Sequence, residues 1–296
     1  MDVSVIIGTY NRCDILLASL RHIVTMDVPD DITWELLVVD NNSSDMTREL
    51  VHNLKTESGA DINYLFEKRQ GLSYARNRGI EESHGRIIAF LDDDCIVDPG
   101  WLSCLVHEFR SDPVLSGIGG RVELFDERDK PVTLMTSMER RLFSSGQLFS
   151  FMHGCNMAFD RNVFQKIGGF DVRLGPGTKI AAAEDADLIY RVYKSGFRML
   201  YCPDLCVYHN HGRRLDSQVA SLLKGYTRGR GAFYFKHIVK GDAGVLKIAY
   251  WQLSALINTV IRSSNGEKTR WETIRYLQDL LVGGYYYLAF CQGSEK

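Results

Sequence analysis

The chain has 296 residues, of which 45% are hydrophobic and 24% are charged, and its formal net charge is −2. This is the composition of a globular protein, and it offers no overall positive charge for binding nucleic acid. The first residues carry no basic and apolar leader pattern, so we expect a cytoplasmic protein. The seven cysteines are an odd number without a CxxC pair, which favours reduced thiols over a disulfide framework or a zinc site.

Four short apolar runs in the first hundred residues predict β-strands, at residues 3–7, 36–39, 62–66 and 86–91. Helical patterns separate them: one has an apolar stripe from Ile15 to Val24, a second follows a cap at Ser44 or Asp45, and a third covers 74–82. Apolar runs that are nearly continuous indicate strands covered on both faces, as in a parallel sheet between helices. The sequence therefore predicts an α/β fold.

Polar residues follow three of these runs directly. Thr9-Tyr10-Asn11 comes after the first run, Asp40-Asn41 after the second and Asp92-Asp93-Asp94 after the last. The carboxyl ends of parallel strands meet at one edge of a sheet, and ligands bind there in open α/β sheets. We therefore expect a ligand site at this edge.

The three consecutive aspartates need something to compensate their charge. If the chain stays extended, Asp92 and Asp94 lie on the same face with their Cα atoms about 6.5–7 Å apart, which leaves room for a hard cation. Oxygen ligands of this kind favour Mg²⁺ or Mn²⁺. The alternative is a solvated acidic turn in which Asp98 caps a helix that begins near Pro99. The position at the end of a strand favours the metal site.

Several segments, taken in order, resemble the successive motifs of family 2 glycosyltransferases. They are VSVIIGTYNR (3–12), LLVVDNNSSD (36–45), GLSYARNRGI (71–80), IIAFLDDD (87–94), GGRV (119–122), GCNMAFDRNVF (154–164), GGFD (168–171), EDADL (184–188) and VYH (207–209). The resemblance extends over residues 3–212 and implies the GT-A fold, a Rossmann-like and mostly parallel sheet flanked by helices. In that family, the aspartates of a DxD motif hold a divalent metal on the diphosphate of a nucleotide-sugar.

Carried over residue by residue, the resemblance implies roles for these positions. Asp94 is the implied metal ligand, and Asp92 lies near the ribose and the metal. His209 completes the metal shell, with His211 as its alternative because both point to one side of a strand. The residues implied in donor binding are Thr9, Asn11, Asp40, Arg76, Asp92 and Asp93, and those implied on the acceptor side are Gly154, Cys155 and Asn156.

The segment AAAEDADLIYRVYKSGF (181–197) predicts a helix whose first turn carries Glu184 and Asp185. The helix dipole favours the ionised form of a carboxylate in this position, so that it can accept a proton. Simple capping is the alternative, since most acidic residues at helix starts do only that. With the resemblance, Asp185 is the expected general base for the acceptor hydroxyl, and Glu184 is expected to contact the acceptor.

The composition changes after residue 212, where we expect a catalytic domain (1–212) to end, with a nucleotide-sugar half (1–120) and an acceptor half (121–212). Residues 205–240 contain seven basic residues, at 213, 214, 224, 228, 230, 236 and 240, against one acid, Asp216. Two uncharged stretches follow, 248–261 and 280–294, both shorter than the ~20 residues of a membrane span. The helical extension (213–296) is expected to pack on the catalytic domain, to form a homodimer surface, or to lie on the inner face of the cell membrane.

Together these features predict a metal-dependent, inverting glycosyltransferase that moves a sugar from a nucleotide-sugar to an acceptor hydroxyl, in polysaccharide or glycoconjugate synthesis. Asp40 is compatible with uridine, so a UDP-sugar is favoured, and the acceptor is expected to be a lipid-linked or oligosaccharide chain. Two alternatives are a non-catalytic module that binds nucleotide-sugars and a nucleotidyltransferase. The second would need a glycine-rich basic loop after the first strand, where GTYNRCD has a single glycine.

Overall fold

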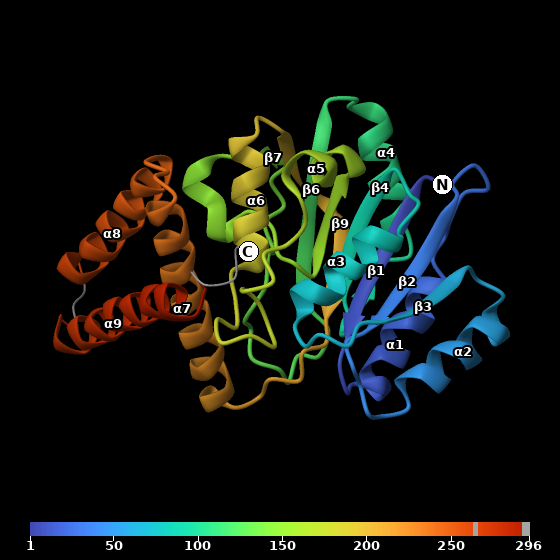
Figure 1. Cartoon of the computed structure of the whole chain (residues 1–296), viewed down its shortest axis with the longest axis horizontal. Coiled ribbons are helices and arrows are strands. Elements are labelled where there is room, and N and C mark those ends of the chain that lie inside the picture. The colour runs from blue at the N-terminus through green and yellow to red at the C-terminus, as the bar shows by residue number, and fades with distance from the viewer. Residues whose placement is uncertain (263–265, 292–296) are drawn as a thin grey trace.

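The computed structural model describes residues 1–262 and 266–291, which form an α/β domain with a group of helices on one side (Figure 1). The N-terminal part alternates strands and helices. These are β1 (Val3–Thr9), α1 (Cys13–Val24), β2 (Trp34–Asp40), α2 (Thr47–Ser58), β3 (Ile62–Phe66), α3 (Leu72–Glu82) and β4 (Ile87–Asp92). The four predicted strands are present, and β1, β2 and β4 are buried over nearly their whole length, as continuous apolar runs predict.

The register of the sheet brings the polar strand ends together. The strand order is β3-β2-β1-β4-β8-β6-β9-β5, with β7 (Arg141–Leu142) paired to β9. The pairs β1–β2, β1–β4 and β2–β3 are parallel, with Thr9 aligned to Asp40 and Gly8 aligned to Asp92. The residues that follow these strands therefore leave the sheet at the same edge.

The prediction that the three aspartates continue an extended strand is wrong. β4 ends at Asp92, the next two residues form a turn, and the short strand β5 (Cys95–Val97) follows. β5 pairs antiparallel with β9 (Arg198–His209), which aligns Cys95 with His209. The turn and this pairing bring Asp94 next to the histidine at the end of β9.

The remaining elements of the domain carry the other half of the sheet. They are α4 (Trp101–Ser111), β6 (Leu115–Leu124), the 3₁₀ helix η1 (Ser145–Ser150), β8 (Asn156–Asp160), α5 (Arg161–Ile167) and α6 (Glu184–Lys194). β8 is antiparallel to β4 and to β6, whereas β6 and β9 are parallel. A Cβ atom on Gly120 of β6 would lie 1.8 Å from the carbonyl oxygen of Leu205, so glycine is required for β9 to pack here. As predicted, α6 begins at Glu184.

Three long helices follow β9: α7 (Asp216–Val239), α8 (Gly244–Arg262) and α9 (Gly266–Cys291), drawn from orange to red in Figure 1. α7 is joined to the domain by a buried ion-pair network, in which Lys236 Nζ lies 2.6 Å from both Asp171 Oδ2 and Asp187 Oδ1. The predicted uncharged stretches lie in α8 and α9, apart from 292–294, which are outside the described residues. Within residues 1–262 and 266–291, none of the helices combines the length and the apolar character needed to cross a membrane.

Candidate active site

A cavity of about 460 Å³ opens where β1 and β4 end and reaches to α6 and α7. Ten of the residues that the sequence singled out line it: Thr9, Arg76, Asp92, Asp93, Asp94, Gly154, Cys155, Glu184, Asp185 and His209. Three others, Asn11, Asp40 and Asn156, are not among the lining residues. The fold therefore gathers most of the predicted site around one space.

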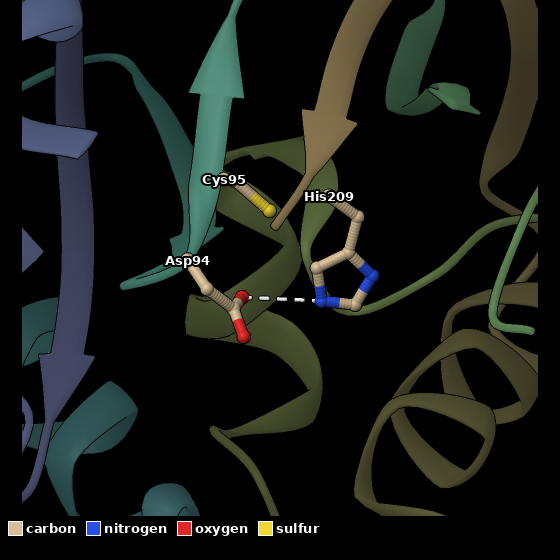
Figure 2. A group of neighbouring side chains, drawn as sticks. All are labelled: Asp94, Cys95 and His209. Carbon is tan, nitrogen blue, oxygen red and sulfur yellow. Dashed lines mark ion pairs between the residues drawn. The ribbon is translucent and has the colours of Figure 1, made fainter. Parts of the chain in front are cut away.

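Asp94 and His209 form the most compact pair of possible metal ligands in this cavity. Asp94 Oδ1 lies 3.1 Å from His209 Nε2, and Figure 2 shows the sulfur of Cys95 extending toward the same space. The ligand atoms of these three residues lie within 4.8 Å of one another. Asp94 Oδ1 is buried, and apart from this contact with His209 it has no partner in the described part of the chain. Since a divalent cation would satisfy this oxygen and the histidine nitrogen together, the residues fit such an ion.

Asp94 and His209 shift each other's pKa. Burial alone would lower the pKa of His209, but the Asp94 carboxylate and the nearby Cys155 and Asp92 raise it to about 9. Burial alone would raise the pKa of Asp94, but His209 and Arg12 hold it below its usual range. The aspartate is therefore ionised, as a metal ligand must be, whereas His209 is protonated near neutral pH in the absence of a metal and would release its proton when the ion binds.

Arg12 is a counter-ion of the aspartate cluster that the sequence analysis did not single out. Its Nη1 lies 2.5 Å from Asp93 Oδ1 and its Nη2 lies 2.8 Å from Asp94 Oδ2. The Thr9 hydroxyl donates a second hydrogen bond, of 2.8 Å, to Asp93. These contacts compensate the negative charge of the adjacent carboxylates. The available signal was a basic residue shortly after β1, at the edge where Asp92 was expected.

Arg76 links the aspartate cluster to the start of α6. Its side chain is only 2% exposed, with Nη2 2.9 Å from Asp92 Oδ1 and Nη1 3.2 Å from Glu184 Oε1. Nη2 also donates a 3.1 Å hydrogen bond to the carbonyl oxygen of Gly154. Burial and the charge of Asp185 raise the pKa of Glu184 to about 7, against the opposing effect of Arg76. Glu184 is thus buried, held by a cation and partly protonated near neutral pH.

Asp185 is the more accessible of the two carboxylates at the start of α6. It is half-buried and lines the cavity. The backbone N–H of Gly154 donates to its Oδ2 at 3.2 Å, and the N–H of Ala186 donates to its Oδ1 at 2.7 Å. Gly154 therefore contacts both Arg76, through its carbonyl oxygen, and Asp185, through its N–H. This leaves Asp185 as the carboxylate that can meet a ligand in the cavity.

Asp40 and Asn11, which were expected at the nucleoside pocket, form hydrogen bonds to neighbouring segments of the chain. Asp40 accepts hydrogen bonds from the Ser43 N–H at 2.8 Å and from the Tyr64 hydroxyl at 2.7 Å, which occupy both carboxylate oxygens. Asn11 is exposed and its side-chain oxygen accepts from the Ser44 N–H at 2.7 Å. The neighbouring Asn41, which the sequence did not favour, lines the cavity in their place.

The prediction that Asn156 lies on the acceptor side is not supported by its surroundings. Its side chain is fully buried, donates to the carbonyl oxygens of Arg121 and Leu205, and accepts from the Trp101 indole. These bonds connect β8 to β6, β9 and α4. His211 is likewise internal: its Nδ1 lies 3.5 Å from Asp129 and accepts from the backbone N–H of Arg213.

The far wall of the cavity comes from the helical extension. Leu222, Tyr226 and Arg230 of α7 line it at intervals of four residues, which places them on one face of the helix. Phe149 of η1 also lines the cavity, and the Arg230 guanidinium lies 4.7 Å from the centre of its ring. The sequence grouped the α7 residues in a basic and aromatic stretch, but no local pattern indicated that they face the site.

Comparison with known proteins identifies the family. The model of glycosyl transferase family 2 matches residues 4–168, more than half of the chain. The chain belongs to this family. A relative from Haloferax volcanii, glucosyl-dolichyl phosphate glucuronosyltransferase, is 27% identical in an alignment of 226 positions that covers 71% of this chain and 69% of the relative. This membership makes the protein a glycosyltransferase, as the sequence predicted.

Solved structures of other glycosyltransferases share the fold. The mannosyltransferase PcManGT from Pyrobaculum calidifontis, in complex with GDP-Man and Mn²⁺, has a TM-score of 0.64 at 18% identity and is matched over 97% of this chain and 86% of its own. Staphylococcus aureus TarS 1-349 in complex with UDP-GlcNAc has a TM-score of 0.63 at 16% identity, over 96% of this chain and 81% of its own. These likenesses confirm the predicted GT-A fold with its C-terminal helices.

Proposed function

We propose that this glycosyltransferase moves a sugar from a nucleotide-sugar to an acceptor hydroxyl, with a divalent metal and with inversion at the anomeric carbon. The observation that carries the proposal is that one cavity contains the Asp94–His209 pair at one side and the accessible Asp185 carboxylate at the start of α6. The first group suits a metal bound to a diphosphate, and the second suits a base for the incoming hydroxyl.

Asp94 and His209 would hold Mn²⁺ or Mg²⁺, with Asp92 beside them. When bound, the metal would neutralise the charge that develops on the diphosphate as the sugar leaves. Arg76 would keep Asp92 in place, since its buried guanidinium contacts that carboxylate at 2.9 Å. Arg12 would balance the remaining aspartate charge through its contacts with Asp93 and Asp94.

Asp185 would accept the proton of the acceptor hydroxyl as that oxygen attacks the sugar. Direct attack by the acceptor, without an enzyme-bound sugar, gives inversion. The contrast between the two carboxylates supports this assignment: Glu184 is buried against Arg76, whereas Asp185 is exposed to the cavity. Glu184 would therefore position the start of α6 and Arg76. The presence of Asp92, Asp94, Asp185 and His209 together around one cavity argues against a non-catalytic module.

The donor class is supported by the structural relatives, whose complexes contain GDP-Man and UDP-GlcNAc. Asp40, the residue behind the sequence-based preference for uridine, does not line the cavity and accepts hydrogen bonds from Ser43 and Tyr64, so the structure adds no support to that preference. We infer a nucleotide-sugar donor.

The acceptor is proposed to be linked to a lipid. The Haloferax relative is named for a dolichyl phosphate substrate. In this chain, four aromatic side chains on α8 and α9 are largely exposed: Tyr250 (65%), Trp251 (57%), Trp271 (64%) and Tyr285 (62%). Tryptophan and tyrosine favour the membrane–water interface, so these exposed side chains suit helices that lie on a bilayer rather than cross it.

Thermal-shift screening of UDP- and GDP-sugars, with MnCl₂ or with EDTA, tests the donor and the metal. A bound donor should raise the melting temperature by mass action, and EDTA should remove the increase. Sugar transfer to a polyprenyl-phosphate-linked acceptor would then separate an enzyme from a binding module. Unchanged transfer in excess EDTA would contradict the metal assignment.

Vesicle co-sedimentation tests the membrane contact. The double change Trp251→Ser and Trp271→Ser should release the protein from vesicles, whereas Phe66→Ser, an exposed aromatic at the end of β3, should not. If wild-type protein does not pellet with any vesicle, these exposed side chains serve another contact, such as a second copy of the chain, which light scattering would detect.

A further inference from the structure

Arg213 has a charged nitrogen without a partner at the edge of the cavity. It lies in the segment that joins β9 to α7 and is a lining residue of the cavity. Its Nη1 is buried, and no hydrogen-bond partner for it exists among the described residues. A buried guanidinium nitrogen that lacks an acceptor is costly. Such a group is therefore expected to meet an acceptor that is not part of the chain.

Three other basic residues of the stretch 205–240 are already paired with carboxylates. Arg214 contacts Asp126 at 2.9 Å and Asp129 at 3.0 Å. Arg228 lies 2.8 Å from Asp279, and Lys236 lies between two aspartates. The contrast between the adjacent Arg213 and Arg214 is the most informative, because only the first faces the cavity. The pairing of Arg228 also removes the basis for expecting it to bind anionic membrane headgroups.

Two other cations of the cavity, Arg12 and Arg76, are compensated by carboxylates, whereas Arg230 contacts the Phe149 ring and the Tyr276 hydroxyl. Arg12 is paired with Asp93 and Asp94, and Arg76 is paired with Asp92 and Glu184. The described carboxylates at the strand edge thus have cations of their own. An anion brought by a substrate would give Arg213 the acceptor that these carboxylates do not provide.

The backbone of Arg213 is fixed close to the Asp94–His209 pair. Arg213 follows His209 by four positions; its N–H donates to His211 Nδ1 at 3.0 Å, and its carbonyl oxygen accepts from the Lys130 N–H at 2.7 Å. Its charge acts on the Tyr226 phenol of α7, as does the opposite charge of Asp185. Arg213 therefore lines the cavity close to Tyr226 of α7, with its backbone held beside His211.

We propose that Arg213 is a phosphate-binding residue, whose guanidinium donates hydrogen bonds to a phosphoryl oxygen brought by a substrate. This inference rests on the proposed function. Guanidinium groups bind phosphate with two parallel N–H donors, which a point charge does not match. The donor diphosphate is the source we favour, because charge develops on it during transfer and because Arg213 lines the same cavity as the Asp94–His209 pair. A phosphate on a lipid-linked acceptor has the same chemistry.

The test compares Arg213→Ala with Arg214→Ala. Calorimetry would first identify which of UDP and GDP binds wild-type protein with MnCl₂, and then compare that diphosphate with its monophosphate. Arg213→Ala should bind the diphosphate about 10- to 100-fold more weakly, the loss expected for a hydrogen bond to a charged group. Monophosphate binding should change little, and Arg213→Lys should restore only part of the affinity. Arg214→Ala, whose side chain contacts only aspartates, should bind both nucleotides normally.

A second titration distinguishes the source of the phosphate. Farnesyl phosphate in detergent would be added to protein saturated with the nucleoside diphosphate. Weakened farnesyl phosphate binding, with normal diphosphate binding, would assign Arg213 to the acceptor. If Arg213→Ala retains wild-type affinity for both probes, the phosphate role is refuted. If wild-type protein itself binds neither diphosphate, the proposed function fails instead.

Discussion

Replacing Lys236 with methionine removes a charge from the junction between α7 and the catalytic domain while keeping the aliphatic side chain. Lys236 is 4% exposed, and its Nζ lies 2.6 Å from Asp171 Oδ2 and 2.6 Å from Asp187 Oδ1. The loss of one partner from a buried ion pair costs about 3–5 kcal/mol. Asp187 keeps Arg191 at 2.8 Å and His237 at 3.0 Å, so we expect a cost near 3 kcal/mol.

The assay is thermal or urea unfolding of Lys236→Met beside wild type and Lys224→Met, an exposed lysine on the same helix. At about 2–4 °C per kcal/mol for a domain of this size, the melting temperature should fall by about 6–12 °C. Asp187 lies two residues after Asp185 on α6, so transfer activity should fall as well. A change below about 1 kcal/mol would refute the view that this network holds α7 against the active site.

Three further predictions follow from the structure. Asp94→Ala should lose Mn²⁺-dependent donor binding, which calorimetry with and without MnCl₂ would measure. Gly120→Ala should destabilise the fold by about 1–3 kcal/mol or more in urea unfolding, because its Cβ would meet the Leu205 carbonyl at 1.8 Å, whereas Gly225→Ala, with open space around it, should not. Burial raises the pKa of Asp171, but the Arg173 hydrogen bond and then Lys236 lower it to about 2, so their contribution to stability is complete above about pH 4 and lost as pH falls toward 2. Lys236→Met should flatten this acid dependence.

The local sequence pattern was sufficient to predict the strands and to predict that the polar residues at their ends lie at one edge of the sheet. Continuous apolar runs marked β1, β2 and β4, and parallel pairing then aligned Thr9, Asp40 and the first aspartate of the cluster. The start of α6 at Glu184 could also be predicted, because two acidic residues precede an apolar helical stripe. These features depend on residues close together in the sequence or on the general geometry of parallel sheets.

The ion-pair partners of the charged residues could not be predicted from the sequence, because they depend on contacts between segments that are far apart in the chain. Arg12 and Asp93 are 81 positions apart in the sequence, and Arg76 and Glu184 are 108 positions apart. The extended geometry assumed for Asp92 to Asp94 failed because a turn intervenes. Nor did composition indicate that Arg213 would lack a partner while Arg214 had two.

The assignment of Asp185 as the general base is the central claim, and Asp185→Asn tests it most directly. The substitution keeps the shape of the side chain and removes its basicity. Transfer should therefore fall by about 10²- to 10⁴-fold while donor affinity, measured by calorimetry on the same preparation, stays near wild type. Glu184→Gln is the matched control. If Asp185→Asn remains active while Glu184→Gln shows the large loss with normal donor binding, the buried carboxylate is the base and this account of the site is contradicted.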